Sequence, residues 1–187
     1  MTIGGTGVML LGCVGSFIVF VGLARLLIRR LGPVTAIAIA GFCWTVLCIG
    51  ILTLIPARWG IGVVPVEQAQ TQCSLDYGGP APDGFWILPG SQRLLNIAVF
   101  VPAGALWVLA VARWRSAWVL APLGIAALGL YSIAIEALQL AASRIGRACD
   151  VTDMVDNLMG AVIGGVVGLL LALVLRPWRR RRLAAWN

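Results

Sequence analysis

Five long apolar runs are the feature that most constrains what this chain can fold into. A helix of about 20 apolar residues crosses the hydrocarbon core of a bilayer, and each run is close to that length. Only 11% of the 187 residues are charged, whereas a soluble domain carries about a quarter. The sequence therefore predicts one all-α domain over residues 1–187, a polytopic membrane bundle of five transmembrane helices. The predicted spans cover residues 3–27, 34–55, 94–111, 117–142 and 153–175.

The arginines predict how this bundle is oriented. All 14 basic residues are arginines, and four of them, Arg58, Arg93, Arg144 and Arg147, lie on the side opposite to the other ten. Because cytoplasmic segments carry the excess of positive charge, the basic tail at 176–187 is expected in the cytoplasm. The N-terminus and the long loop at 56–93 are then outside. No positive charge precedes the first run, so we expect a retained span of a multi-pass plasma-membrane protein, not a cleaved signal peptide.

The composition excludes several classes of site. The chain has no histidine, which removes histidine-based triads and histidine-ligated zinc. It also has no glycine-rich phosphate loop of the Walker or Rossmann spacing. The net charge of +7 does not indicate a nucleic-acid surface, because the arginines are dispersed between apolar runs. We expect no metal, no cofactor and no nucleic-acid partner.

Two of the five cysteines lie outside the predicted spans. Cys73 is in the long outer loop and Cys149 is in the link between the fourth and fifth spans. Both are predicted on the oxidising side of the membrane, where a disulfide would persist. A disulfide that pins the loop over the last two spans is therefore possible, although spacing alone does not show that the two cysteines meet.

The fourth and fifth spans each carry a polar face near their predicted outer ends. A charged side chain within a span is costly and usually faces the bundle interior, which makes Glu136 a candidate functional residue. Ser132 and Gln139 share its helix face. On the fifth span, Asp153 and Asn157 continue a row of glycines that would allow close helix packing, either within the bundle or in a homo-oligomer. These glycines are Gly160, Gly164 and Gly168.

Polar groups from a third span fall at the same predicted depth. Asn96 lies at the outer end of the third span, and Pro102 further along frees a backbone carbonyl that can bend the helix. Arg93, Arg144 and Arg147 lie at the adjoining rim, where they could pair with the carboxylates. Two interpretations are open: an internal network that holds three helices in register, or a polar cavity that opens to the outer leaflet.

Three motifs together resemble a known family. They are Asn96-xxx-Phe100-x-Pro102-x-Gly104, Glu136-xx-Gln139, and Arg147-xx-Asp150-xx-Asp153-xxx-Asn157-xx-Gly160-xxx-Gly164. With Thr53-Leu54-Ile55-Pro56 at the end of the second span, they are similar to the VanZ-like family of small membrane proteins over about residues 45–175. The loop that contains Cys73 and the additional acid Asp156 depart from the family pattern. The resemblance implies a cell-envelope protein linked to teicoplanin resistance, without implying a particular reaction.

The first functional hypothesis is binding of a ligand in the outer leaflet. The partner would be a membrane lipid, a lipid-linked envelope precursor or a lipoglycopeptide antibiotic. Carboxylates would accept hydrogen bonds from hydroxyls or amines, amides would make neutral contacts, and arginine would meet a phosphate or carboxylate. The candidate binding residues are Asn96, Glu136, Gln139, Arg147, Asp150, Asp153 and Asn157, and the candidate packing residues are Pro102, Gly104, Gly160, Gly164 and Gly168.

Two alternatives assign other activities to the same acids. Glu136 could couple protons to the movement of a lipid, as in a transporter or flippase. That reading predicts polar residues in both halves of the membrane, and the inner half has almost none. Glu136 and Asp153 could instead act as a paired acid and base on a lipid-linked bond, which is the candidate catalytic pair. No nucleophile, metal set or oxyanion site of recognisable spacing accompanies them.

Overall fold

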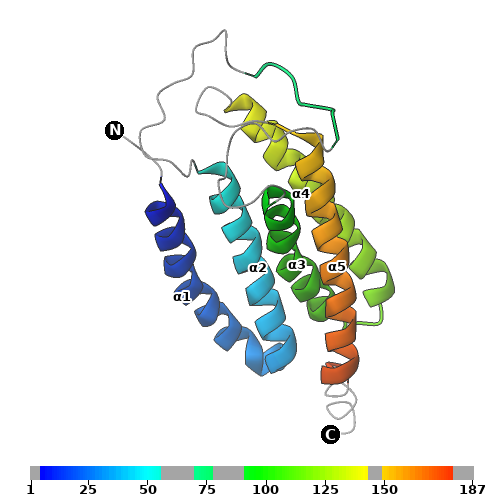
Figure 1. The fold of residues 1–187 in the computed structure, drawn as a ribbon. Helices are drawn as coiled ribbons and strands as arrows, with labels where there is room; N and C mark the ends of the chain where they lie inside the picture. Colours follow the sequence, from blue (N-terminus) through cyan, green and yellow to red (C-terminus); the bar gives the residue numbers. More distant parts are fainter. Residues whose placement is uncertain (1–4, 56–69, 78–90, 143–148, 179–187) are drawn as a thin grey trace, which may run out of the picture.

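A computed structural model describes residues 5–55, 70–77, 91–142 and 149–178, and its regular elements are five helices (Figure 1). The helices are α1 (Thr6–Leu31), α2 (Pro33–Leu54), α3 (Ser91–Val111), α4 (Ala117–Ala141) and α5 (Val151–Leu175). All five are long and apolar enough to cross a membrane. The predicted all-α bundle of five transmembrane helices is therefore confirmed, whereas its orientation stays a prediction.

The first helix extends beyond the end that the apolar run predicts. The expected span stops at residue 27, but α1 continues through Arg29 and Arg30 to Leu31. Long arginine side chains can reach the membrane surface while the backbone remains helical, so charge alone does not end a helix. The helix ends at Gly32, which has a φ of 76° and is followed by Pro33 at the start of α2.

The bundle has two ends, which we name by the segments found there. At the loop end, α2 and α4 finish while α3 and α5 begin; at the tail end, α1 turns into α2 and α5 finishes (Figure 1). The described arginines toward the tail end are Arg25, Arg29, Arg30, Arg113, Arg115 and Arg176. The tail end is thus the end that the arginine count predicts to be cytoplasmic.

Helices α3 and α5 make the closest contact in the bundle, backbone against backbone. A Cβ atom placed on Gly164 would overlap the carbonyl group of Val101, and one on Gly160 would overlap that of Ile97. Gly104 and Gly168 also lie at this contact. Small residues allow two membrane helices to approach in this way. Helix α3 covers the row of glycines on α5, so this face is not available for contact with a second copy of the chain.

An apolar core joins four of the helices and supports the polar residues above it. Its buried members are Ile49, Phe100, Ala103, Leu128, Ile135 and Ala161. Asn96 lies one turn from Phe100 toward the loop end, and Glu136 directly follows Ile135. Helix α1 lies at the edge of the bundle beside α2, where the indole N–H of Trp44 donates to the Cys13 carbonyl at 2.9 Å (Figure 1).

Candidate functional site

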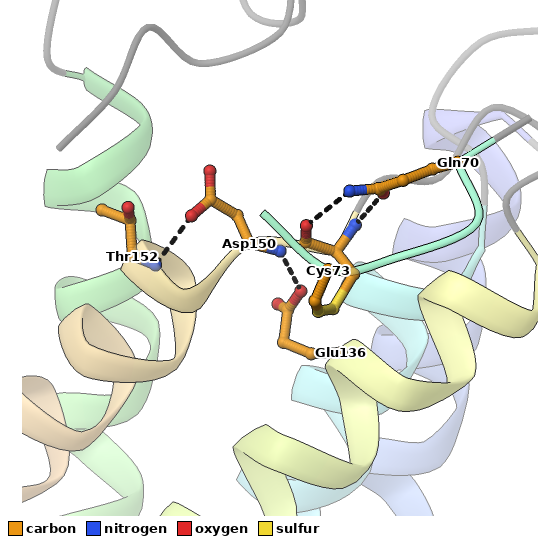
Figure 2. Close-up of a disulfide and its surroundings, with 6 residues drawn as sticks. Gln70, Cys73, Glu136, Asp150 and Thr152 are labelled. Atoms are coloured by element: carbon orange, nitrogen blue, oxygen red, sulfur yellow. Dashed lines mark hydrogen bonds between the residues drawn. A yellow bond between two sulfur atoms is a disulfide. The ribbon is translucent and has the colours of Figure 1, made fainter. Parts of the chain in front are cut away.

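Residues 70–77, which we call the strap, are attached to the start of α5. A disulfide joins Cys73 to Cys149, with 4.8 Å between their Cα atoms (Figure 2). That separation lies within the usual range for a disulfide. The link that the sequence left possible is thus present, and it connects positions 76 residues apart.

Hydrogen bonds on both sides of the disulfide strengthen this attachment. The backbone N–H of Ser74 donates to the Cys149 carbonyl, and the N–H of Val151 donates to the Ser74 carbonyl, both at 3.0 Å. The Gln70 amide donates to the carbonyl of Cys149 at 2.9 Å and accepts from its N–H at 2.6 Å (Figure 2). The strap therefore fixes the backbone that leads into α5.

Asp150 serves as the N-terminal cap of α5. Its side chain accepts a hydrogen bond from the Thr152 N–H at 2.8 Å, which satisfies one of the free N–H groups at a helix start (Figure 2). Its own backbone N–H donates to Oε2 of Glu136 at 2.9 Å. The structure thus gives Asp150 two contacts, a helix cap through its carboxylate and a backbone contact with Glu136, and its predicted role in ligand binding stays a prediction.

The predicted residues of α3, α4 and α5 meet in pairs at the loop end. The Asn96 amide donates to Oδ1 of Asp153 at 2.6 Å, and the Asn157 amide donates to the Ser132 hydroxyl at 2.9 Å. Ser132, Glu136 and Asn157 are all buried. Two polar contacts therefore join α5 to its two neighbours just above the apolar core.

Gln139 extends the site to the end of α2. Its amide nitrogen donates to the Thr53 carbonyl at 2.9 Å, one residue before α2 ends. The side chain is buried, and its oxygen Oε1 has no hydrogen-bond partner among the described residues. An unpaired acceptor in a buried position is rare in native proteins and calls for an explanation.

Asp156 is the site residue that the sequence interpretation missed. The guanidinium of Arg93 binds it through two parallel hydrogen bonds, Nε to Oδ2 and Nη2 to Oδ1, each 2.9 Å long. Arg93 also donates to the Tyr77 hydroxyl at 2.7 Å and lies over its ring, so the strap contacts this ion pair. Asp156 is fully buried, whereas 43% of the Arg93 side chain is exposed.

We call these side chains at the loop end, which make separate polar contacts between helices, the polar cluster. Its members are Arg93, Asn96, Ser132, Glu136, Gln139, Asp153, Asp156 and Asn157. Arg144 and Arg147, the other predicted rim arginines, lie outside the described residues. In the part of the chain that the structure describes, no group of three or more cysteine, aspartate or glutamate side chains could hold a metal ion.

A comparison with protein-family models decides the family. The VanZ/LLP1 model matches residues 42–175, which includes most of α2 and all of the later helices. The chain belongs to the VanZ/LLP1 family. No match was found among curated proteins or solved structures. All residues of the polar cluster lie within the part that the VanZ/LLP1 model matches, whereas α1 precedes it.

Among the described residues of this VanZ/LLP1 site, acidic side chains outnumber basic ones. As the structure describes it, the polar cluster contains the carboxylates of Glu136, Asp153 and Asp156 but one guanidinium, and that guanidinium is bound to Asp156. The N-terminus of α5 adds partial positive charge near Asp150 and Asp153. Among the described residues of the cluster, carboxylates therefore outnumber guanidinium groups, which suits a ligand that brings hydroxyl or amine groups.

Proposed function

We propose that this VanZ/LLP1 protein binds the polar head of a lipid-linked or amphiphilic ligand at the polar cluster, from the outer leaflet of the plasma membrane. The ligand would be an envelope precursor or an amphiphilic antibiotic of the teicoplanin type. A protein that holds either molecule at the membrane surface would alter glycopeptide resistance without making a new precursor.

The observation that carries the proposal is the position of Glu136. An acid inside a transmembrane helix is costly and is a functional candidate by default. Glu136 is only 2% exposed, yet the hydrogen bond that the described residues give it comes from a backbone N–H and not from an arginine. A purely structural acid would gain more from a paired guanidinium, which is the arrangement at Asp156.

The depth of the polar cluster supports a ligand that is anchored in the membrane. The cluster lies in the last turns of α4 and the first turns of α3 and α5, while apolar residues fill the bundle below it. A ligand with an apolar tail could keep the tail in the bilayer and place its head at this level. Hydroxyl or amine donors on that head could reach Glu136 and the unpaired Oε1 of Gln139.

Native mass spectrometry of the gently extracted full chain tests this proposal. The wild type should carry a defined lipid or envelope precursor, and Glu136→Ala and Asn157→Ala should lose it. Asp76→Asn is the matched control, because Asp76 is an exposed acid on the strap outside the polar cluster. Teicoplanin can be added to the same samples as a candidate ligand.

The alternative of a purely structural network gives a different result. In that case all four proteins would carry the same unselective lipid mixture, and the two cluster variants would differ from wild type only by a lower melting temperature. That result would overturn the proposed binding function.

A further inference from the structure

Gln139 has a buried side-chain oxygen with no hydrogen-bond partner among the described residues. The side chain is 8% exposed, and its amide nitrogen is committed to the Thr53 carbonyl. Exchanging the two ends of the amide would place two oxygens against each other, so the donor contact fixes which end is free. Oε1 therefore remains a buried acceptor without a donor among the described residues. Leaving a buried acceptor without a hydrogen bond costs free energy, so Oε1 of Gln139 is suited to accept from a donor beyond the described residues, such as a bound ligand.

The surroundings of this oxygen favour a donor with positive charge. Helix α2 ends one residue after Thr53, and α4 ends two residues after Gln139. The last carbonyls of a helix carry partial negative charge, so two negative helix ends meet here. Glu136 precedes Gln139 by three residues, which places both side chains on the same face of α4. Arg93, the arginine that the structure describes in the polar cluster, is bound to Asp156.

We propose that the ligand of the polar cluster carries a protonated primary amine, which donates to Oε1 of Gln139 and pairs with the carboxylate of Glu136. This inference rests on the proposed binding function and names the chemical class of the ligand head. Side chains three residues apart on a helix have Cβ atoms about 5–6 Å apart, so one ammonium group can reach both. A primary ammonium has three donors and so can serve both acceptors at once. Because Gln139 is near the ends of α2 and α4, the amine approaches from the loop end.

Three probes with the same twelve-carbon tail separate charge from hydrogen bonding. Dodecylammonium has a charge and N–H donors, dodecyltrimethylammonium has the charge without donors, and 1-dodecanol has a donor without the charge. Each is titrated into the full-length protein in a non-ionic detergent, and bound molecules are counted by native mass spectrometry. The wild type should bind dodecylammonium at least about tenfold more tightly than either other probe, the difference expected for a charged hydrogen bond.

Gln139→Met then tests the amide oxygen itself. This change keeps the length of the side chain and should weaken dodecylammonium about tenfold while leaving dodecyltrimethylammonium unchanged. Leu138→Met is the matched control, since Leu138 is 54% exposed on the neighbouring position and should bind all probes as wild type does. If Gln139→Met binds dodecylammonium as tightly as wild type, Oε1 does not accept a hydrogen bond from the amine, and the inference is wrong.

The wild-type titrations keep the inference testable if Gln139→Met does not fold. Equal affinity of wild type for dodecylammonium and dodecyltrimethylammonium would show that N–H donors are not needed, and would overturn the inference. The proposed function is judged separately by the co-purified ligand. If Glu136→Ala loses that ligand while wild type binds the two cationic probes equally, the proposed binding function stands. The inference that the ligand carries a primary amine is then wrong.

Discussion

The backbone N–H of Asp150 donates to Oε2 of Glu136 at 2.9 Å, so the residue that caps α5 also holds the buried acid of α4. Removing the carboxyl group by Glu136→Ala leaves this N–H without its partner, which costs about 1–3 kcal/mol. Glu136→Gln retains an acceptor oxygen and should be destabilised by less. Thermal unfolding of the two variants in detergent checks this order. Equal melting temperatures for Glu136→Ala and wild type would contradict a supporting role for the contact.

The disulfide between Cys73 and Cys149 should stabilise the loop end of the molecule. It closes a loop across 76 residues, and a bridge of this kind typically contributes about 2–4 kcal/mol. We expect Cys73→Ser and Cys149→Ser to lower the melting temperature by similar amounts, and the double variant to be no worse than either. Reductant should lower the melting temperature of wild type but not of the double variant.

A free cysteine provides the control for this experiment. Cys43 lies within α2 and is not in a disulfide, so Cys43→Ser should leave the response to reductant unchanged. A reductant effect that persists in the Cys73→Ser/Cys149→Ser double variant would show that another group is responsible.

The ion pair of Arg93 and Asp156 should respond unequally to removal of its two members. Arg93→Ala leaves a fully buried carboxylate without its guanidinium, so we expect a clear loss of stability. Asp156→Ala should cost less, because the Arg93 side chain is 43% exposed and water can solvate it. Chemical or thermal unfolding of both single variants and the double variant measures the difference. If Asp156→Ala lowers the stability more than Arg93→Ala, the difference in burial does not determine which loss is more destabilising.

The contact between α3 and α5 should not tolerate a side chain at Gly164. A Cβ atom there would overlap the backbone carbonyl of Val101, so Gly164→Ala must push the helices apart. Overpacking of this kind costs about 1–3 kcal/mol or more. Gly15→Ala on α1 is the matched control, since nothing lies within 4 Å of a Cβ at that position. Similar melting temperatures for the two variants would contradict the close contact.

The sequence predicts the helices well because length and hydropathy alone decide whether a segment can cross a membrane. The five spans follow from the apolar runs, and their boundaries differ by a few residues from those observed. The largest difference is at the end of α1, where Arg29 and Arg30 remain helical. Hydropathy alone places the end of the span at the first arginines, although their long side chains can reach the membrane surface from within a helix. The better signal for the end of α1 is Gly32 followed by Pro33.

The contacts within the polar cluster depend on relations between helices that one sequence does not contain. Helix periodicity places Asp153 and Asn157 on one face, yet the pairing of Asn96 with Asp153 depends on the register of α3 against α5. That register is set by the backbone contact at the glycines. Asp156 was visible as an acid within a span, and the register brings it opposite Arg93. The strap residues Gln70 and Tyr77 lie in a segment without periodicity, so no sequence signal indicated them.

The orientation of the bundle is a prediction that rests on two independent features of the chain. The described arginines between helices and after α5 lie at the tail end, and the positive-inside rule places this end in the cytoplasm. The disulfide lies at the loop end, and disulfides persist on the oxidising side of the membrane. A green fluorescent protein fused after Asn187 should therefore be fluorescent, and alkaline phosphatase fused after Tyr77 should be active. Phosphatase fused after Arg115, in the link between α3 and α4, should be inactive. Active phosphatase after Arg115 with inactive phosphatase after Tyr77 would reverse the orientation, and it would place the polar cluster and its proposed ligand at the cytoplasmic leaflet.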